Sequence, residues 1–81
     1  MRPALLGARL AHTLGALLLI EARDHAREES RLAVLTAARA LDEGDELAVD
    51  TERCRILCAD ARADYCDRRI SEMAMDAREA A

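Results

Sequence analysis

The chain has 81 residues and a formal net charge of −4, from 12 basic and 16 acidic side chains. Every basic residue is arginine, Asn, Gln, Phe and Trp are absent, and apolar residues make up 52% of the chain. This composition excludes a basic nucleic-acid-binding arm and a disordered chain. The restricted alphabet fits either a gene very rich in G and C or an artificial sequence.

Alanine and leucine dominate, whereas glycine and proline are scarce, so we expect a single all-α domain over residues 1–81. Tyr65 is the only aromatic residue. A chain of this size buries only about 60% of its unfolded surface, and without aromatic side chains its core must be thin. We therefore expect a homo-oligomer, most simply a dimer.

The first predicted helix begins near Pro3, a residue suited to a first turn. Four leucines then recur after four, four and three residues and mark a single helical face: Leu6, Leu10, Leu14 and Leu17. The segment faintly resembles a secretory signal, but Arg9 and His12 interrupt its apolar run, and no small-residue cleavage site follows. It is also too short to span a bilayer, so no membrane association is expected.

Residues 21–31 interrupt the apolar face with charged side chains. Two interpretations remain open. One is a continuous or kinked helix supported by the i,i+3 pairs Asp24–Arg27 and Glu28–Arg31. The other is a turn with Ser30 as the N-cap of a new helix.

The segment Asp42-Glu-Gly-Asp-Glu46 is the clearest break in the chain. Gly44 suits a left-handed helix C-cap, and Asp45, Asp50 or Thr51 could cap the next helix, which is predicted over about residues 47–80. Acidic and basic side chains spaced by four residues predict a solvent-facing stripe on this helix: Asp60, Asp64, Arg68, Glu72 and Asp76.

The apolar residues of the last helix follow two registers shifted by one residue, a rotation of about 100°. The first comprises Thr51, Cys54, Cys58, Ala61 and Tyr65. The second comprises Cys66, Ile70, Met73 and Ala77. This pattern predicts different neighbours at the two ends of the helix. The expected fold is an antiparallel helical hairpin or a three-helix unit that completes a bundle by dimerisation.

Three cysteines, Cys54, Cys58 and Cys66, are the candidate metal ligands. Cys54 and Cys58 are one helical turn apart and could bind Cu(I); zinc would need further ligands from Cys66, His25 or a second chain. Packing as small buried hydrophobes and an intermolecular disulfide are the alternatives. An odd number of thiols favours a reducing compartment, hence the cytoplasm.

The segment Ala38-Arg-Ala-Leu-Asp-Glu-Gly-Asp-Glu-Leu-Ala48, followed by Leu57-Cys58-Ala59-Asp60, resembles the cysteine-rich four-helix-bundle copper-storage proteins, as does Arg23-Asp24-His25-Ala26. The resemblance spans about residues 23–66 and implies thiolate binding of Cu(I) inside a helical bundle. Only Cys58 falls in the register of that family. Arg62 and Tyr65 occupy positions that would continue its cysteine ladder, and its final cysteine-rich helix is missing.

No catalytic residue is predicted, because neither His12 nor His25 can be placed beside a cysteine as a base. The leading hypothesis is a non-enzymatic protein, without a cofactor, that binds a copy of itself or another protein. Thiolate binding of Cu(I) or zinc is one alternative, and an artificial or recently arisen sequence without an evolved function is another. The residues expected to make the contact are Leu10, Leu14, Leu17, Leu32, Leu35, Leu57, Ile70 and Met73.

Overall fold

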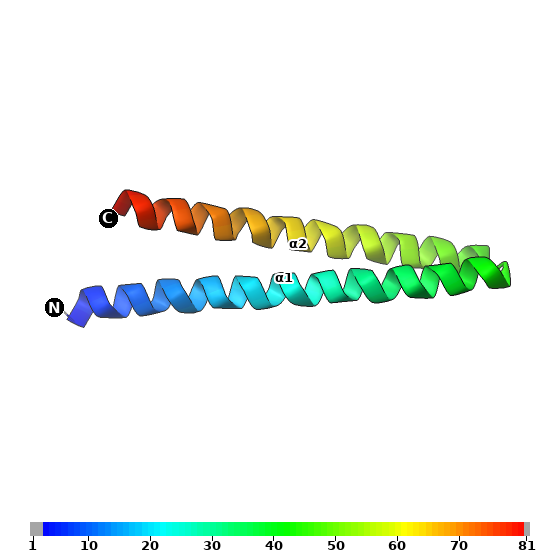
Figure 1. The fold of residues 1–81 in the computed structure, drawn as a ribbon, viewed down its shortest axis with the longest axis horizontal. Helices are drawn as coiled ribbons and strands as arrows, with labels where there is room; N and C mark the ends of the chain where they lie inside the picture. Colours follow the sequence, from blue (N-terminus) through cyan, green and yellow to red (C-terminus); the bar gives the residue numbers. More distant parts are fainter. Residues whose placement is uncertain (1–2, 81) are drawn as a thin grey trace.

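Two long helices form an antiparallel hairpin in a computed structural model that describes the backbone of residues 3–80 and the side-chain burial of residues 7 and 9–79. Helix α1 spans Pro3–Glu43 and helix α2 spans Glu46–Ala80 (Figure 1). The hairpin alternative is therefore confirmed and the three-helix alternative is not adopted. The 41 residues of α1, at about 1.5 Å each, account for the longest extent of 63 Å.

Helix α1 continues without interruption through residues 21–31. The predicted ion pair between Glu28 and Arg31 is present, with 2.5 Å between Oε1 and Nη2. The second predicted pair is replaced, because Arg27 reaches across to Asp67 of α2 instead of binding Asp24. A turn at Ser30 does not form, since this segment consists mainly of helix-forming residues whose charges find partners on the helix surface.

The turn between the helices uses the predicted glycine. Gly44 has a φ of 71°, and its N–H donates to the carbonyl of Leu41, while the N–H of Asp45 donates to that of Ala40. This pair of bonds is a Schellman motif, which satisfies the last carbonyls of α1. Asp45 then caps α2, because its Oδ1 accepts a hydrogen bond of 3.1 Å from the N–H of Ala48.

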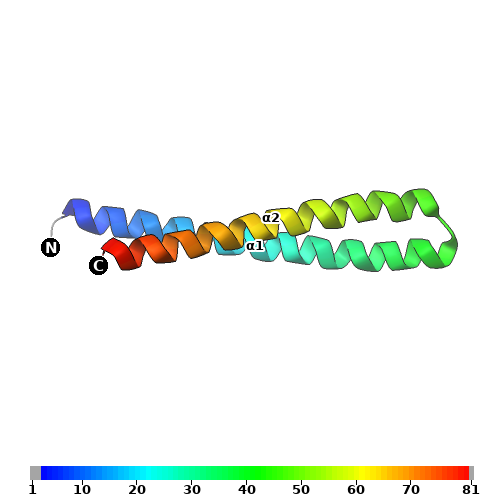
Figure 2. The same ribbon diagram turned by 90° about the horizontal axis from the view of Figure 1, so that it is seen from above.

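A seam of small side chains joins the two helices. On α1, three alanines spaced by seven residues are buried: Ala26, Ala33 and Ala40. On α2, the buried apolar residues are Ala59, Ala63 and Cys66. Recurrence every seven residues on α1 and every three or four residues on α2 is the pattern of a coiled coil, and the two helices wind around each other when Figures 1 and 2 are compared. Alanine at these positions lets the helix backbones approach closely.

The two predicted registers of α2 lie on different faces, but not at different ends. All residues of the first register are exposed, including Cys54, Cys58 and Tyr65. This register is therefore not buried against α1. The second belongs to the seam from Cys66 to Met73, while Ala77 is exposed, and the seam extends back through Ala63, Ala59 and Ile56 to Glu52 and Val49. The predicted rotation of the buried face does not occur within the hairpin, because one heptad phase faces α1 from Val49 to Met73 while the other apolar stripe faces outward.

Solvent surrounds the rest of the hairpin. The predicted polar stripe of α2 is exposed, and so are His12 and His25. Leu6 lies outside the residues whose side chains are described. Within the described part of the chain, no helix is both long and apolar enough to cross a membrane.

The alanine seam predicts a severe penalty for a larger side chain at its centre. Ala59 is completely buried, so Ala59→Leu must force the helices apart and should lower the free energy of unfolding by about 1–3 kcal/mol. Urea denaturation followed by circular dichroism measures the change. Ala38→Leu, at an exposed position of α1, is the control and should be nearly neutral; equal stability of the two variants would contradict the seam.

Candidate interaction surface and cysteine pair

The large apolar side chains lie mainly on the outside of the hairpin. Leu47 is 79% exposed, Leu18 66% and Leu57 63%. The remaining exposed large apolar residues are Leu10, Leu14, Leu17, Leu32, Val34, Leu35, Leu41, Tyr65 and Met75. Among the residues whose burial is described, none larger than cysteine belongs to the buried apolar core. Within the described residues, the molecule thus packs its small side chains inside and presents nine of its leucines to the solvent.

Most residues predicted to make an intermolecular contact are on this outer surface, which we call the leucine surface. Six of the eight are exposed: Leu10, Leu14, Leu17, Leu32, Leu35 and Leu57. The other two, Ile70 and Met73, are half-buried in the seam between the helices. A Cβ added at Gly15 would lie 3.5 Å from Cε of Met73, an ordinary van der Waals distance, so Met73 packs beside Gly15 of α1. Ile70 and Met73 therefore belong to the hairpin itself.

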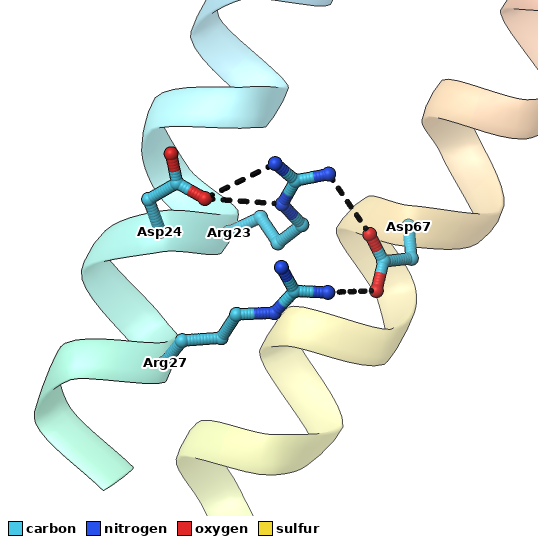
Figure 3. A network of polar contacts seen from close by, with 4 residues as sticks. All are labelled: Arg23, Asp24, Arg27 and Asp67. Carbon is cyan, nitrogen blue, oxygen red and sulfur yellow. Dashed lines mark hydrogen bonds and ion pairs between the residues drawn. The ribbon is translucent and has the colours of Figure 1, made fainter. Parts of the chain in front are cut away.

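Asp67 links the two helices through two arginines of α1 (Figure 3). Its Oδ1 accepts from Nη1 of Arg23 at 3.3 Å, and its Oδ2 accepts from Nη2 of Arg27 at 2.9 Å. Asp24 also accepts from Nε of Arg23. The hydrogen bond to Asp24, with a further contribution from Asp67, raises the pKa of Arg23 above its ordinary value, although partial desolvation acts in the opposite direction. The network holds an arginine at a seam position beside a carboxylate of the opposite helix.

Two further charged contacts flank the seam. Arg62 donates to Glu29 of α1 at 2.6 Å, so it binds a carboxylate of its own chain. Glu52 is 93% buried at a seam position of α2, and Arg55 of the same helix donates to both of its carboxylate oxygens at 3.2 and 3.3 Å. Because charged groups at or beside a coiled-coil seam specify register and orientation, the contact between Arg62 and Glu29 favours the antiparallel pairing that the Gly44 turn imposes.

The structure separates the three candidate metal ligands into a pair and a single residue. Cys54 and Cys58 are exposed on the outer face of α2, one turn apart. Cys66 is 7% exposed and packs in the seam. The hairpin alone therefore does not enclose the cysteine pair in a thiolate-lined interior, which the resemblance to copper-storage proteins implies. Within the described residues, no three His, Cys, Asp or Glu side chains are grouped to hold a metal ion.

Comparison with protein-family models, with curated proteins and with solved structures finds no match to this chain. The resemblance to the copper-storage proteins rests only on the residues quoted above. The proposed function therefore depends on the fold and the leucine surface.

The contacts of Asp67 predict that its charge stabilises the hairpin. Asp67→Asn should lower the midpoint of urea denaturation, because Arg23 and Arg27 lose their shared carboxylate, and the difference from wild type should shrink as salt is added. Asp60→Asn, which changes an exposed aspartate on the same helix, is the matched control. Indistinguishable midpoints for the two variants would contradict a stabilising role for the network.

Burial of Cys66 predicts slow chemical labelling. In the double variant Cys54→Ala, Cys58→Ala, iodoacetamide should modify Cys66 roughly tenfold or more slowly in native buffer than in urea, because the seam must open first. Mass spectrometry of quenched samples follows the reaction. Equal rates in the two buffers would show that the seam does not cover this thiol.

Proposed function

We propose that this chain is a non-enzymatic protein that acts through self-association, with the leucine surface as the contact. The observation that supports this proposal is the inverted distribution of side chains, with alanine in the seam and nine leucines exposed. Extended exposed apolar surface of this kind is typical of protein–protein interaction sites. A second copy is the simplest partner because it carries the same surface.

Simple energetics favour association over a solvated monomer. Complete burial of one leucine side chain contributes about 1.5–3 kcal/mol, whereas the alanines of the seam contribute much less because their side chains are small. The hairpin therefore leaves most of its available hydrophobic stabilisation unused until a partner covers it. Small domains of this kind commonly gain stability by forming oligomers.

The location that suits this proposal is a reducing compartment, the cytoplasm. Cys54, Cys58 and Cys66 are free thiols, and exposed thiols persist where glutathione and thioredoxin keep them reduced. Thiolate binding of Cu(I) or zinc is the second candidate function, favoured by the exposed pair one turn apart.

Sedimentation equilibrium tests self-association. Wild-type protein should sediment as a dimer or larger species, and Leu57→Asp should raise the dissociation constant at least roughly tenfold, because a leucine that the proposed dimer buries is replaced by a carboxylate. Leu57 is largely exposed in the hairpin, so the helical content of the variant monomer should persist. Leu14→Asp should act in the same direction.

A matched control is available on the same helix. Ser71 lies two heptads after Leu57 at an equivalent exposed position, so Ser71→Asp introduces the same charge without removing an apolar side chain. It should leave the dissociation constant nearly unchanged. A wild-type protein that remains monomeric at every concentration would contradict the proposal.

A further inference from the structure

The outward face of α2 carries a second coiled-coil stripe, distinct from the seam with α1. Its members recur after four, three, four, three and four residues, and all are exposed and uncharged: Leu47, Thr51, Cys54, Cys58, Ala61 and Tyr65. We call this set the outer stripe. It covers about 27 Å of the helix at about 1.5 Å per residue, and the charged residue Arg68 ends it. Spacing of this kind is that of the core positions of a coiled coil.

The two edges of the outer stripe carry opposite charges. Asp50 and Asp64 lie on one edge, with Leu57 between them, and all three are exposed. The other edge is basic and consists of Arg55, Arg62 and Arg69, which are also exposed. In the described part of the chain, no ion pair involves Asp50 or Asp64.

This distribution of charge selects both the partner and its direction. When two copies of α2 pair in parallel, each acidic edge faces the basic edge of the other copy, with partners five residues apart. Asp50 then meets the second copy's Arg55, and Asp64 meets the second copy's Arg69. In an antiparallel pair, acidic edges would face each other and basic edges would do the same. Complementary charge therefore favours a second copy in parallel orientation.

The arginines of the basic edge are able to make these additional contacts. The side chain of Arg55 is 53% exposed while it binds Glu52, and that of Arg69 is 45% exposed while it binds Glu72. A guanidinium group has five N–H donors in a planar fork, so each arginine can bind a second carboxylate. Helix α1 does not obstruct the approach, because its seam lies on the opposite face of α2.

Parallel pairing brings four thiols together. Cys54 would lie opposite Cys54 of the second copy and Cys58 opposite Cys58, in two adjacent layers of the interface one helical turn apart. Four thiolates match the tetrahedral coordination that zinc prefers in structural sites, with Zn–S distances of about 2.3 Å. Each copy supplies half of this ligand set, so the site is incomplete without the partner.

We propose that two copies pair in parallel through the outer stripe of α2 and that Cys54 and Cys58 of both copies together bind one Zn²⁺. This inference rests on the proposed self-association and specifies the α2 part of the contact, where Leu47 and Leu57 lie, together with its orientation and its ligand. Zinc binds as thiolates replace water, and the thiol protons are released to the solvent. Metal binding and pairing are therefore coupled, and zinc should tighten the dimer.

A charge-reversal pair tests the orientation. Asp64→Arg and Arg69→Asp should each weaken the homodimer roughly tenfold, because two attractions become repulsions. An equimolar mixture of the two variants should restore wild-type affinity as a heterodimer, since both edge contacts are then complementary. In an antiparallel dimer, Asp64→Arg would instead relieve repulsion between acidic edges, so a tighter homodimer would overturn the proposal.

Native mass spectrometry and Co²⁺ substitution under reducing conditions test the metal site. We expect one Zn²⁺ per two chains and, with Co²⁺, the visible and charge-transfer absorption bands of a tetrahedral thiolate complex. Cys54→Ser together with Cys58→Ser should abolish both signals, whereas Cys66→Ala, which changes only the seam, should preserve them. Circular dichroism confirms that each variant remains helical.

The results of these experiments distinguish failure of the parallel zinc site from failure of self-association. A dimer that binds no Zn²⁺, or that ignores the charge reversals, overturns the parallel thiolate site but leaves self-association in place. A chain that remains monomeric with and without Zn²⁺ overturns both. A heterodimer restored by mixing, with Zn²⁺ lost only in the Cys54 and Cys58 variant, supports the inference.

Discussion

The constraint on which this molecule depends is the close approach of two helices along a seam of alanines. Ala26, Ala33 and Ala40 on α1 and Ala59 and Ala63 on α2 are its buried alanines. Alanine has the highest helix propensity and loses no side-chain entropy when it is buried. The seam therefore costs little to order, but it also gains little from the hydrophobic effect. Length compensates in part, because the contact continues along most of both helices.

The small side chains of the seam determine which apolar residues are exposed on the surface. A helix whose alanines face inward must turn its leucines away from that partner, since the two sets occupy different heptad positions. Leu47 and Leu57 are exposed for this reason and not because α2 is loosely packed. The placement of the smallest apolar side chains between the helices thus leaves the leucines exposed, and the proposed function depends on these exposed leucines.

Polar contacts supply the specificity that alanine cannot. The buried alanines of α1 repeat every seven residues and by themselves would tolerate a shift by one heptad. Asp67 pairs with Arg23 and Arg27, and Glu29 pairs with Arg62, so the correct alignment satisfies charges on both sides of the seam. The Schellman turn at Gly44 acts in the same direction, because two residues between the helices allow little freedom in register. The local turn and the long-range ion pairs therefore favour the same alignment of the two helices, and such agreement is typical of sequences that specify one fold.

The sequence by itself determined the helical class, the position and chemistry of the turn at Gly44 and Asp45, the exposed polar stripe of α2 and the pairing of Glu28 with Arg31. These features follow from contacts within a few residues. Only the tertiary structure decided which of two apolar stripes on α2 became the seam, and hence that Cys66 is buried while Cys54 and Cys58 are exposed. Glu52 interrupts the seam with a charge, whereas the outer stripe carries none, so hydropathy alone favoured the outer stripe as the buried face over residues 51–65. The physical reason is that burial depends on the size of side chains on both helices together: alanine opposite alanine permits close packing, and that fit appears only when the two helices are placed side by side.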